Sequence, residues 1–129
     1  MEGILVLMER ITIEGLEVFA FHGCNPGERR DGQIFLLDIL LEFDSRRACV
    51  SDDLRDTVNY SQVAKRAAAM FIEPPCNLIE RAAYRTARGI LKEFAPLRSV
   101  TLRVHKPDAP LQLQVADIIY EITLKGEEA

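Results

Sequence analysis

Histidine and cysteine are scarce in this chain, and their scarcity argues against the common metal sites. The 129 residues contain two histidines, His22 and His105, and three cysteines. Neither an HxxxH nor a CxxC spacing occurs, although zinc sites are usually built on such patterns. We therefore expect no metal ion. The odd number and wide separation of Cys24, Cys49 and Cys76 favour reduced thiols in a cytoplasm.

An excess of positive charge and a long apolar run are also missing. The chain has 16 Lys+Arg against 20 Asp+Glu and a net charge of −4, which argues against a nucleic-acid surface. The apolar run Ile4–Leu7 is too short to span a membrane, and Glu2 stands where a signal peptide has a basic flank. We expect a cytoplasmic protein with no nucleic-acid or membrane partner, in which residues 1–8 form a frayed extension.

The motifs of several large enzyme classes are absent as well. The sequence has no Walker loop, no dinucleotide-binding glycine pattern, and no Ser/His/Asp or Cys/His arrangement of a nucleophile. It also has no repeat, low-complexity tract or linker, and its 129 residues suffice for one hydrophobic core. We predict a single domain over residues 1–129.

The alternation of apolar and polar residues predicts four strands. In the first, Ile11 and Ile13 alternate with polar neighbours, and after Gly15 the alternation resumes out of phase through Leu16 and Val18. A phase slip at a glycine predicts a β-bulge. The four predicted strands are residues 10–20, 33–44, 100–106 and 115–125.

The second predicted strand is apolar on one face and only half polar on the other. A sheet with helices on one side and water on the other would alternate more cleanly. We infer that a second subunit covers the half-polar face. The apolar face carries Phe35, Leu37, Ile39, Leu41 and Phe43, and the half-polar face carries Ile34, Leu36, Asp38, Leu40 and Glu42.

Apolar residues at three- and four-residue spacing predict two helices between the second and third strands. The helices are Ser61–Phe71 and Leu78–Phe94, separated by Pro74-Pro75. Asn77 is the predicted N-cap of the second helix, so Glu80 lies in its first turn, where unpaired backbone N–H groups stabilise a negative charge. The order ββααββ predicts an α+β domain, with two helices on one face of a four-stranded antiparallel sheet.

Three further side chains are candidates for chemistry. Glu28 lies in a loop after the first strand, Tyr60 precedes the first helix, and Lys106 ends the third strand just before a proline-containing turn. A phenol near a helix N-terminus can stack on a flat ligand or pass a proton. Taken singly, each residue is explained at least as well by a surface or structural role.

Five short motifs lie along the chain, in a fixed order from about Glu9 to Leu124. They are Phe19-Ala20-Phe21-His22-Gly23, Glu28 with Gly32-Gln33, Asp56-Thr57-Val58-Asn59-Tyr60, Asn77-Leu78-Ile79-Glu80-Arg81 and Val104-His105-Lys106-Pro107. Each motif alone is weak, but together they resemble the dihydroneopterin aldolase family of folate biosynthesis. The resemblance implies the tunnelling fold (T-fold) and a homo-oligomer, an octamer of two tetrameric rings with active sites between subunits.

The resemblance also implies roles for the candidate residues. Glu80 would bind the amino-pyrimidinone edge of a pterin substrate, since a carboxylate accepts two parallel N–H bonds from such an edge. The backbone of Ile79 would contact the same ring. Tyr60, contributed by a neighbouring subunit, would stack on the pterin and take part in proton transfer. Glu28 would bind hydroxyls of the substrate's side chain, and Lys106 would act as general base through a water.

The implied reaction is the retro-aldol cleavage of dihydroneopterin to 6-hydroxymethyl-dihydropterin and glycolaldehyde. Breaking a carbon–carbon bond requires a group that accepts electrons, and the pterin's own C=N bond can do so. The substrate therefore replaces the lysine Schiff base and the zinc of other aldolases, and no cofactor is implied.

Two features depart from the commoner family pattern and bear on substrate preference. Arg81 stands where histidine is frequent, and Leu111–Val115 is apolar and rich in glutamine where many relatives have a polar, glycine-rich loop. One alternative is a dihydroneopterin (triphosphate) epimerase, for which Arg29-Arg30 and Arg46-Arg47 are the local cation pairs. Another is a non-catalytic pterin-binding oligomer. The metal-dependent synthases of this fold require three histidines, and this sequence has two.

Overall fold

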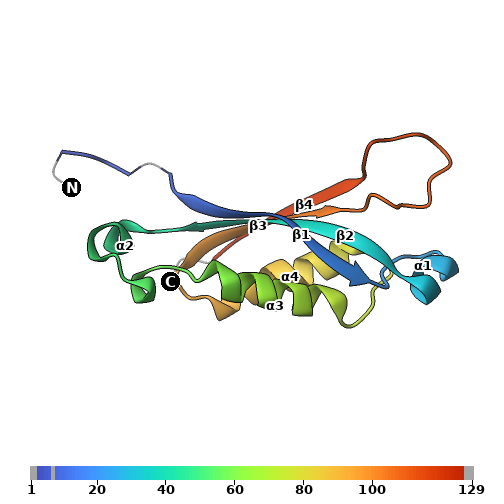
Figure 1. The fold of residues 1–129 in the computed structure, drawn as a ribbon, viewed down its shortest axis with the longest axis horizontal. Helices are drawn as coiled ribbons and strands as arrows, with labels where there is room; N and C mark the ends of the chain where they lie inside the picture. The colour runs from blue at the N-terminus through green and yellow to red at the C-terminus, as the bar shows by residue number, and fades with distance from the viewer. Residues whose placement is uncertain (1–2, 7, 127–129) are drawn as a thin grey trace.

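Four antiparallel strands form the sheet on which the molecule is built (Figure 1). The structure is a computed structural model that describes residues 3–6 and 8–126. The strands are β1 (Arg10–Ala20), β2 (Gln33–Phe43), β3 (Leu97–His105) and β4 (Ile119–Lys125), and they lie in the order β1-β2-β3-β4. The predicted frayed extension at residues 1–8 falls partly outside the described residues.

Two long helices cover one face of the sheet, and in the part of the chain that the structure describes the other face carries no helix (Figure 1). They are α3 (Tyr60–Ile72) and α4 (Ile79–Glu93). Three short helices were not predicted: α1 (Pro26–Asp31) between β1 and β2, and α2 (Arg46–Ser51) and η1 (Leu54–Asp56) before α3. The α+β class is therefore correct, but the predicted order ββααββ leaves out these three elements, and the expected loop around Glu28 is a helix.

The predicted bulge in β1 is confirmed at Gly15. The pairing of β1 with β2 shifts register between Ile13 and Leu16, and Gly15 has a φ of +72°. Its N–H donates to Asp38 Oδ1 in β2 at 2.9 Å. A left-handed backbone conformation favours glycine, so the residue that breaks the alternation also permits the bulge.

Large side chains of the sheet pack against small side chains of the helices to form the core. The apolar face of β2 is buried as predicted, and α4 contributes Ala82, Ala83 and Ala87, all fully buried. Small helix residues let the two layers approach closely enough to fill the space at interior density. Each fully buried Leu or Phe contributes about 1.5–3 kcal/mol. The ends of β2, β3 and α4 are thereby fixed relative to one another.

The prediction that Asn77 caps α4 is wrong. The N-cap is Leu78, which has an extended backbone and makes no side-chain cap hydrogen bond. The Asn77 side chain instead accepts a hydrogen bond from Arg29 Nη1 in α1 at 2.5 Å. The Asn77 side chain therefore binds a distant residue and does not cap its own helix. The reason is that α1, which was not predicted, places Arg29 beside it.

Several strand boundaries also differ from the prediction, among them the end of β2, which is Phe43 instead of residue 44. Strand β4 begins at Ile119 rather than at residue 115, because the Asp117 side chain accepts the N–H of Ile118 and so replaces a ladder hydrogen bond. Strand β3 begins at Leu97, three residues earlier than predicted, because Leu97 pairs with Phe43 beyond a register shift. It ends at His105, one residue early.

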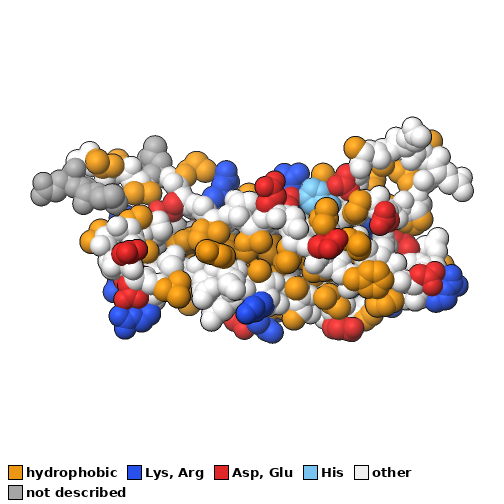
Figure 2. Space-filling model, in the orientation of Figure 1, with side chains coloured by type: hydrophobic (Ala, Val, Ile, Leu, Met, Phe, Trp, Pro, Cys, Tyr) orange, Lys and Arg blue, Asp and Glu red, His pale blue; other side chains and the backbone are white. Residues whose placement is uncertain are grey.

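The helix-free face and the edge strand β1 expose apolar side chains. On β2, Ile34 is 38% exposed, and Leu36 and Leu40 are only partly buried. On β1, Ile11 and Ile13 are partly buried and pack against the core. Figure 2 shows hydrophobic side chains gathered along the middle of the molecule, between the sheet and the helices. In the part of the chain that the structure describes, no helix has the length and apolar character needed to cross a membrane.

Candidate active site

Lys106 and Glu28 form an ion pair where the end of the sheet meets α1. Lys106 directly follows β3, and Glu28 lies in α1, between β1 and β2. The Lys106 Nζ atom lies 2.7 Å from Glu28 Oε2, and the two side chains are 15% and 10% exposed. Charge-assisted hydrogen bonds of this kind are short and strong. Two residues that are far apart in the sequence are thus brought together.

The capping of α1 fixes the position of Glu28. Asn25 is the N-cap, and its side chain accepts the N–H of Gly27 at 2.8 Å. In return, Glu28 Oε1 accepts the N–H of Asn25 at 3.3 Å. Pro26 follows the cap, at a position where a missing N–H removes no helical hydrogen bond. The sequence therefore builds a capping box whose acidic member is also the partner of Lys106.

Gln33, the first residue of β2, supports the same carboxylate. Its Nε2 donates to Glu28 Oε2 at 2.7 Å and to the His22 carbonyl at 3.3 Å. Burial raises the pKa of Glu28, but the hydrogen bonds from Lys106 and Gln33 outweigh it and hold that pKa below its ordinary value. Gln33 Oε1 is buried without a hydrogen-bond partner among the described residues. Gln33 was not predicted as a site residue, although it is a polar residue on the otherwise apolar face of β2.

The buried His22 joins the end of β1 to the segment before α4. Its Nε2 lies 2.5 Å from the Phe71 carbonyl, and its Nδ1 accepts the N–H of Cys76 at 2.9 Å. One ring nitrogen donates and the other accepts, as in neutral imidazole. Burial lowers the pKa of His22 despite the hydrogen bond to Phe71, and the charges of Arg85 and Arg29 lower it further.

His22→Gln is expected to destabilise the protein by about 2 kcal/mol at neutral pH, because buried hydrogen bonds are lost. Since the pKa of His22 is below 6.5 in the folded protein, the stabilisation is fully present above about 6.5 and is lost as pH falls through the folded value. Urea unfolding of both proteins, about one pH unit above and below 6.5, should therefore show a smaller difference at the lower pH. A difference independent of pH would contradict a neutral His22.

Gly23 lets this segment approach Glu28. Its φ is +151°, and its N–H donates to the Cys76 carbonyl at 2.9 Å. A Cβ at this position would lie 2.4 Å from Glu28 Oε1, which is far inside van der Waals contact. The end of β1, the site carboxylate and the segment before α4 therefore meet at a residue without a side chain.

The first turn of α4 presents Ile79 and Glu80 next to this assembly. Arg29 of α1 donates to the Asn77 side chain, and Cys24 Sγ donates to the Asn77 carbonyl at 3.4 Å. Ile79 is partly buried against the core, whereas Glu80 is exposed in the first turn, as predicted. A carboxylate there can accept N–H bonds from a ligand while the helix terminus favours its negative charge.

Tyr60 lies at the opposite end of α3 from the other candidate residues. It is the first residue of that helix and is 62% exposed, whereas Phe71, which contacts His22, is the last but one. A rise of 1.5 Å per residue separates Tyr60 from Phe71 by about 16 Å along the axis. One chain therefore assembles Glu28 and Lys106 near the start of α4, but leaves Tyr60 apart.

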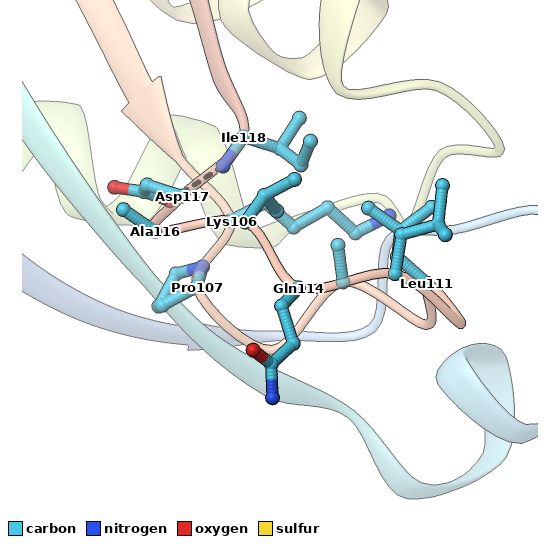
Figure 3. A pocket seen from close by; sticks show the side chains of 10 residues that line it. Lys106, Pro107, Leu111, Gln114, Ala116, Asp117 and Ile118 are labelled. Carbon is cyan, nitrogen blue, oxygen red and sulfur yellow. Dashed lines mark hydrogen bonds between the residues drawn. The ribbon is translucent and has the colours of Figure 1, made fainter.

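A hollow of about 600 Å³ lies beside Lys106, under the loop between β3 and β4. Figure 3 shows Lys106 extended along the base of this loop, with the amide of Gln114 pointing away from it. Glu28 and Gln33 border a second hollow of about 420 Å³. Both sizes fall in the range of about 300–1,000 Å³ that small ligands occupy.

Within residues 3–6 and 8–126, no three His, Cys, Asp or Glu side chains are grouped to hold a metal ion.

The architecture matches that of a solved pterin enzyme. The crystal structure of Escherichia coli dihydroneopterin aldolase in complex with neopterin superposes on this chain with a TM-score of 0.82 and 27% sequence identity. The match covers 91% of this chain and 99% of that chain. The protein is therefore an α+β protein with the fold of a pterin enzyme.

Sequence comparison narrows this class to one family. The family model for dihydroneopterin aldolase matches residues 11–123. The dihydroneopterin aldolase of Streptomyces coelicolor is 42% identical over 115 residues, which is 89% of this chain and 96% of that protein. That of Bacillus subtilis is 33% identical over 118 residues, or 92% and 98% of the two chains. This chain belongs to the dihydroneopterin aldolase family.

Proposed function

We propose that this protein cleaves dihydroneopterin to 6-hydroxymethyl-dihydropterin and glycolaldehyde. Family membership over residues 11–123 supports the reaction class, and the neopterin bound to the Escherichia coli relative supports the ligand class. The observation in this chain that carries the proposal is the 2.7 Å contact between Lys106 and Glu28. It places an amine and a carboxylate together between two hollows of ligand size.

In this proposal Lys106 is the general base and Glu28 binds the hydroxyl groups of the substrate's side chain. The two groups are hydrogen-bonded to each other in the structure. A general base needs a neutral amine, so the ammonium of this ion pair must first lose its proton to solvent. A substrate hydroxyl that donates to Glu28 takes over part of the bonding that stabilises the ammonium, and the neutral amine then accepts the substrate's proton through a water. The pterin C=N bond accepts the electron pair of the broken carbon–carbon bond, so the protein supplies proton transfer and orientation.

The pterin ring is proposed to lie against the first turn of α4. Glu80 accepts two N–H bonds from the amino-pyrimidinone edge, and the Ile79 backbone contacts the same ring. Support comes from the exposure of Glu80 and from the contacts of Arg29 and Cys24 with Asn77, which tie this turn to the segment that carries Glu28.

Tyr60 is proposed to reach the site from a neighbouring subunit, where it stacks on the pterin and takes part in proton transfer. Its position about 16 Å from Phe71 supports this assignment, because one chain cannot supply all the groups at one point. Strands β1 and β4 are the two edges of the sheet. Pairing of β4 in one copy with β1 in the next would continue the antiparallel sheet and close a ring. We propose an octamer of two tetrameric rings.

The test is to incubate the purified protein with dihydroneopterin, without added metal, and to measure three products together. Glycolaldehyde and 6-hydroxymethyl-dihydropterin should appear in equal amounts. Dihydromonapterin alone would show an epimerase instead, and binding without turnover would show a non-catalytic pterin-binding protein.

Most arginines of the two pairs considered for a substrate triphosphate already bind other side chains of this chain. Arg30 contacts Asp31 at 3.0 Å, Arg46 contacts Asp44 at 2.5 Å, and Arg29 binds the Asn77 side chain. Cations that already have carboxylate or amide partners gain less from a phosphate. The structure therefore gives no specific support to an epimerase that acts on dihydroneopterin triphosphate.

A further inference from the structure

Three titratable side chains on the helix-free face form a hydrogen-bonded chain that ends next to Lys106. His105 Nε2 lies 2.6 Å from Asp38 Oδ2, and His105 Nδ1 lies 2.8 Å from Asp117 Oδ2. His105, Asp38 and Asp117 are 17%, 14% and 25% exposed. Figure 2 shows a histidine between acidic side chains on the side of the sheet away from the helices. None of these three residues was predicted to have a role.

Both carboxylates are themselves anchored to the backbone. Asp38 Oδ1 accepts the N–H of Gly15 in the β1 bulge at 2.9 Å. Asp117 Oδ1 accepts the N–H of Ile118 at 2.8 Å, the bond marked in Figure 3. The Lys106 N–H donates to the Ile118 carbonyl at 2.9 Å. His105 therefore connects the bulge of β1 to the closing end of the loop that begins at Lys106.

The charges around His105 favour its protonated form. The hydrogen bond with Asp38 raises the pKa of His105, burial opposes it, and the hydrogen bond with Asp117 raises it further. A ring that faces a carboxylate at each nitrogen satisfies both only when both nitrogens carry protons. The nearby charges are Arg103 of β3, 3.8 Å from Asp38, and Glu121 of β4, 3.6 Å from Arg103.

The residues that pair directly with His105 across the sheet are apolar, and the next residue in that row is acidic. On β2, His105 pairs with the apolar Leu36, which in turn pairs with Glu17 of β1. On β4 it pairs with Ile119, which is also apolar. The two hydrogen-bonded carboxylates are therefore the groups that face the ring directly, and an imidazolium between them balances part of their charge.

We propose that His105, held by Asp38 and Asp117, is a positioning residue for Lys106, an inference that rests on the proposed role of Lys106 as general base. Side chains of consecutive residues in a strand point to opposite faces, and the hydrogen bond from the Lys106 N–H to Ile118 continues the pairing of β3 with β4 by one residue. His105 is fixed on the helix-free face, so Lys106 is directed to the other side, where Glu28 lies. The hydrogen bonds of Asp117 and Ile118 hold the far end of the loop at the same place.

The protonation state of His105 determines whether this arrangement is complete. A neutral imidazole has one N–H and can donate to only one of the two carboxylates. Because the pKa of His105 is raised, the arrangement is fully formed below about 6.5 and is lost as pH rises through the folded value. The loop end next to Lys106 is then released, and the rate of proton transfer falls.

The test compares His105→Ala and Asp117→Asn with the control Thr101→Ala. Thr101 and Thr123 form a 2.8 Å side-chain hydrogen bond between the same two strands, β3 and β4. With dihydroneopterin, His105→Ala should lower kcat about tenfold with little change in KM, because a misplaced base slows chemistry more than binding. Asp117→Asn should move the alkaline fall of kcat about one pH unit lower. Thr101→Ala should change neither.

NMR titration of the two histidines gives a readout that needs no activity. In the wild type, one imidazole should titrate above 6.5 and the other below it, and Asp117→Asn should lower the first value alone. Wild-type kcat in a folded His105→Ala variant, or an unchanged His105 titration in Asp117→Asn, would overturn the proposal. An inactive wild-type protein would overturn the proposed function instead, and the titration would still decide on the hydrogen-bonded arrangement.

Discussion

Lys106→Ala is expected to lower kcat for dihydroneopterin cleavage by about 10²- to 10⁴-fold, the usual contribution of a positioned general base. Removal of the amine also leaves Glu28 without its charged partner, so KM is expected to change as well. Steady-state kinetics that follow glycolaldehyde release would measure both constants. Equilibrium binding of neopterin should be affected much less than kcat, because the pterin ring is proposed to lie on Glu80 instead.

Lys125→Ala is a suitable control for this variant, since Lys125 is an exposed lysine at the end of β4 and lines neither hollow. It should retain wild-type kcat. Lys106→Arg keeps the positive charge but cannot give up its proton near neutral pH. If Lys106→Arg were as active as the wild type, Lys106 would be an electrostatic group and not the general base.

Glu80→Gln is expected to weaken the binding of neopterin about 10- to 100-fold, because a hydrogen bond to a charged group is worth about 1.5–3 kcal/mol. The amide keeps the size of the side chain but offers one oxygen where the carboxylate offers two. Isothermal titration calorimetry with neopterin would measure the change without turnover. kcat at saturating substrate should change less than the affinity does.

Glu93→Gln is the matched control, because Glu93 is the last residue of the same helix and contacts Arg66 at 2.9 Å, away from the first turn. It should bind neopterin as the wild type does. Loss of an acidic side chain from a helix N-terminus also costs about 0.3–1 kcal/mol of stability. Unaltered neopterin affinity in Glu80→Gln, with only this small loss of stability, would mean that Glu80 is purely structural.

The parts of the fold that follow a simple period were predictable from the sequence. The alternation along β2 gave the buried face correctly, and the interruption of the alternation along β1 at Gly15 gave the bulge. The three- and four-residue spacing gave α3 and α4 to within about one residue. Helix α1 was missed because it has only six residues and none of them is buried, so it has no apolar stripe to detect. Its local signals were the capping box Asn25-x-x-Glu28 and Pro26 directly after the cap.

The arrangement of the site was less predictable, because it depends on contacts between distant segments. The sequence pointed to Glu28, Tyr60, Glu80 and Lys106, and the structure brings the first and last of these into contact. Nothing local indicates that Asn77 turns from the helix to Arg29, or that His105 lies between two carboxylates. Both arrangements arise when the sheet and α1 are assembled, and neither leaves a periodic pattern.

The close packing at Gly23 has a consequence for the tolerance of the chain to mutation. Every other amino acid has a Cβ, which would have to displace the Glu28 carboxylate or the backbone around it, and it would also adopt a φ of +151° with strain. In a library with all substitutions at this position, selection for activity should therefore recover glycine alone. Mutations can accumulate over much of the surface around the site. The codon for residue 23, in contrast, must remain one of the four that encode glycine.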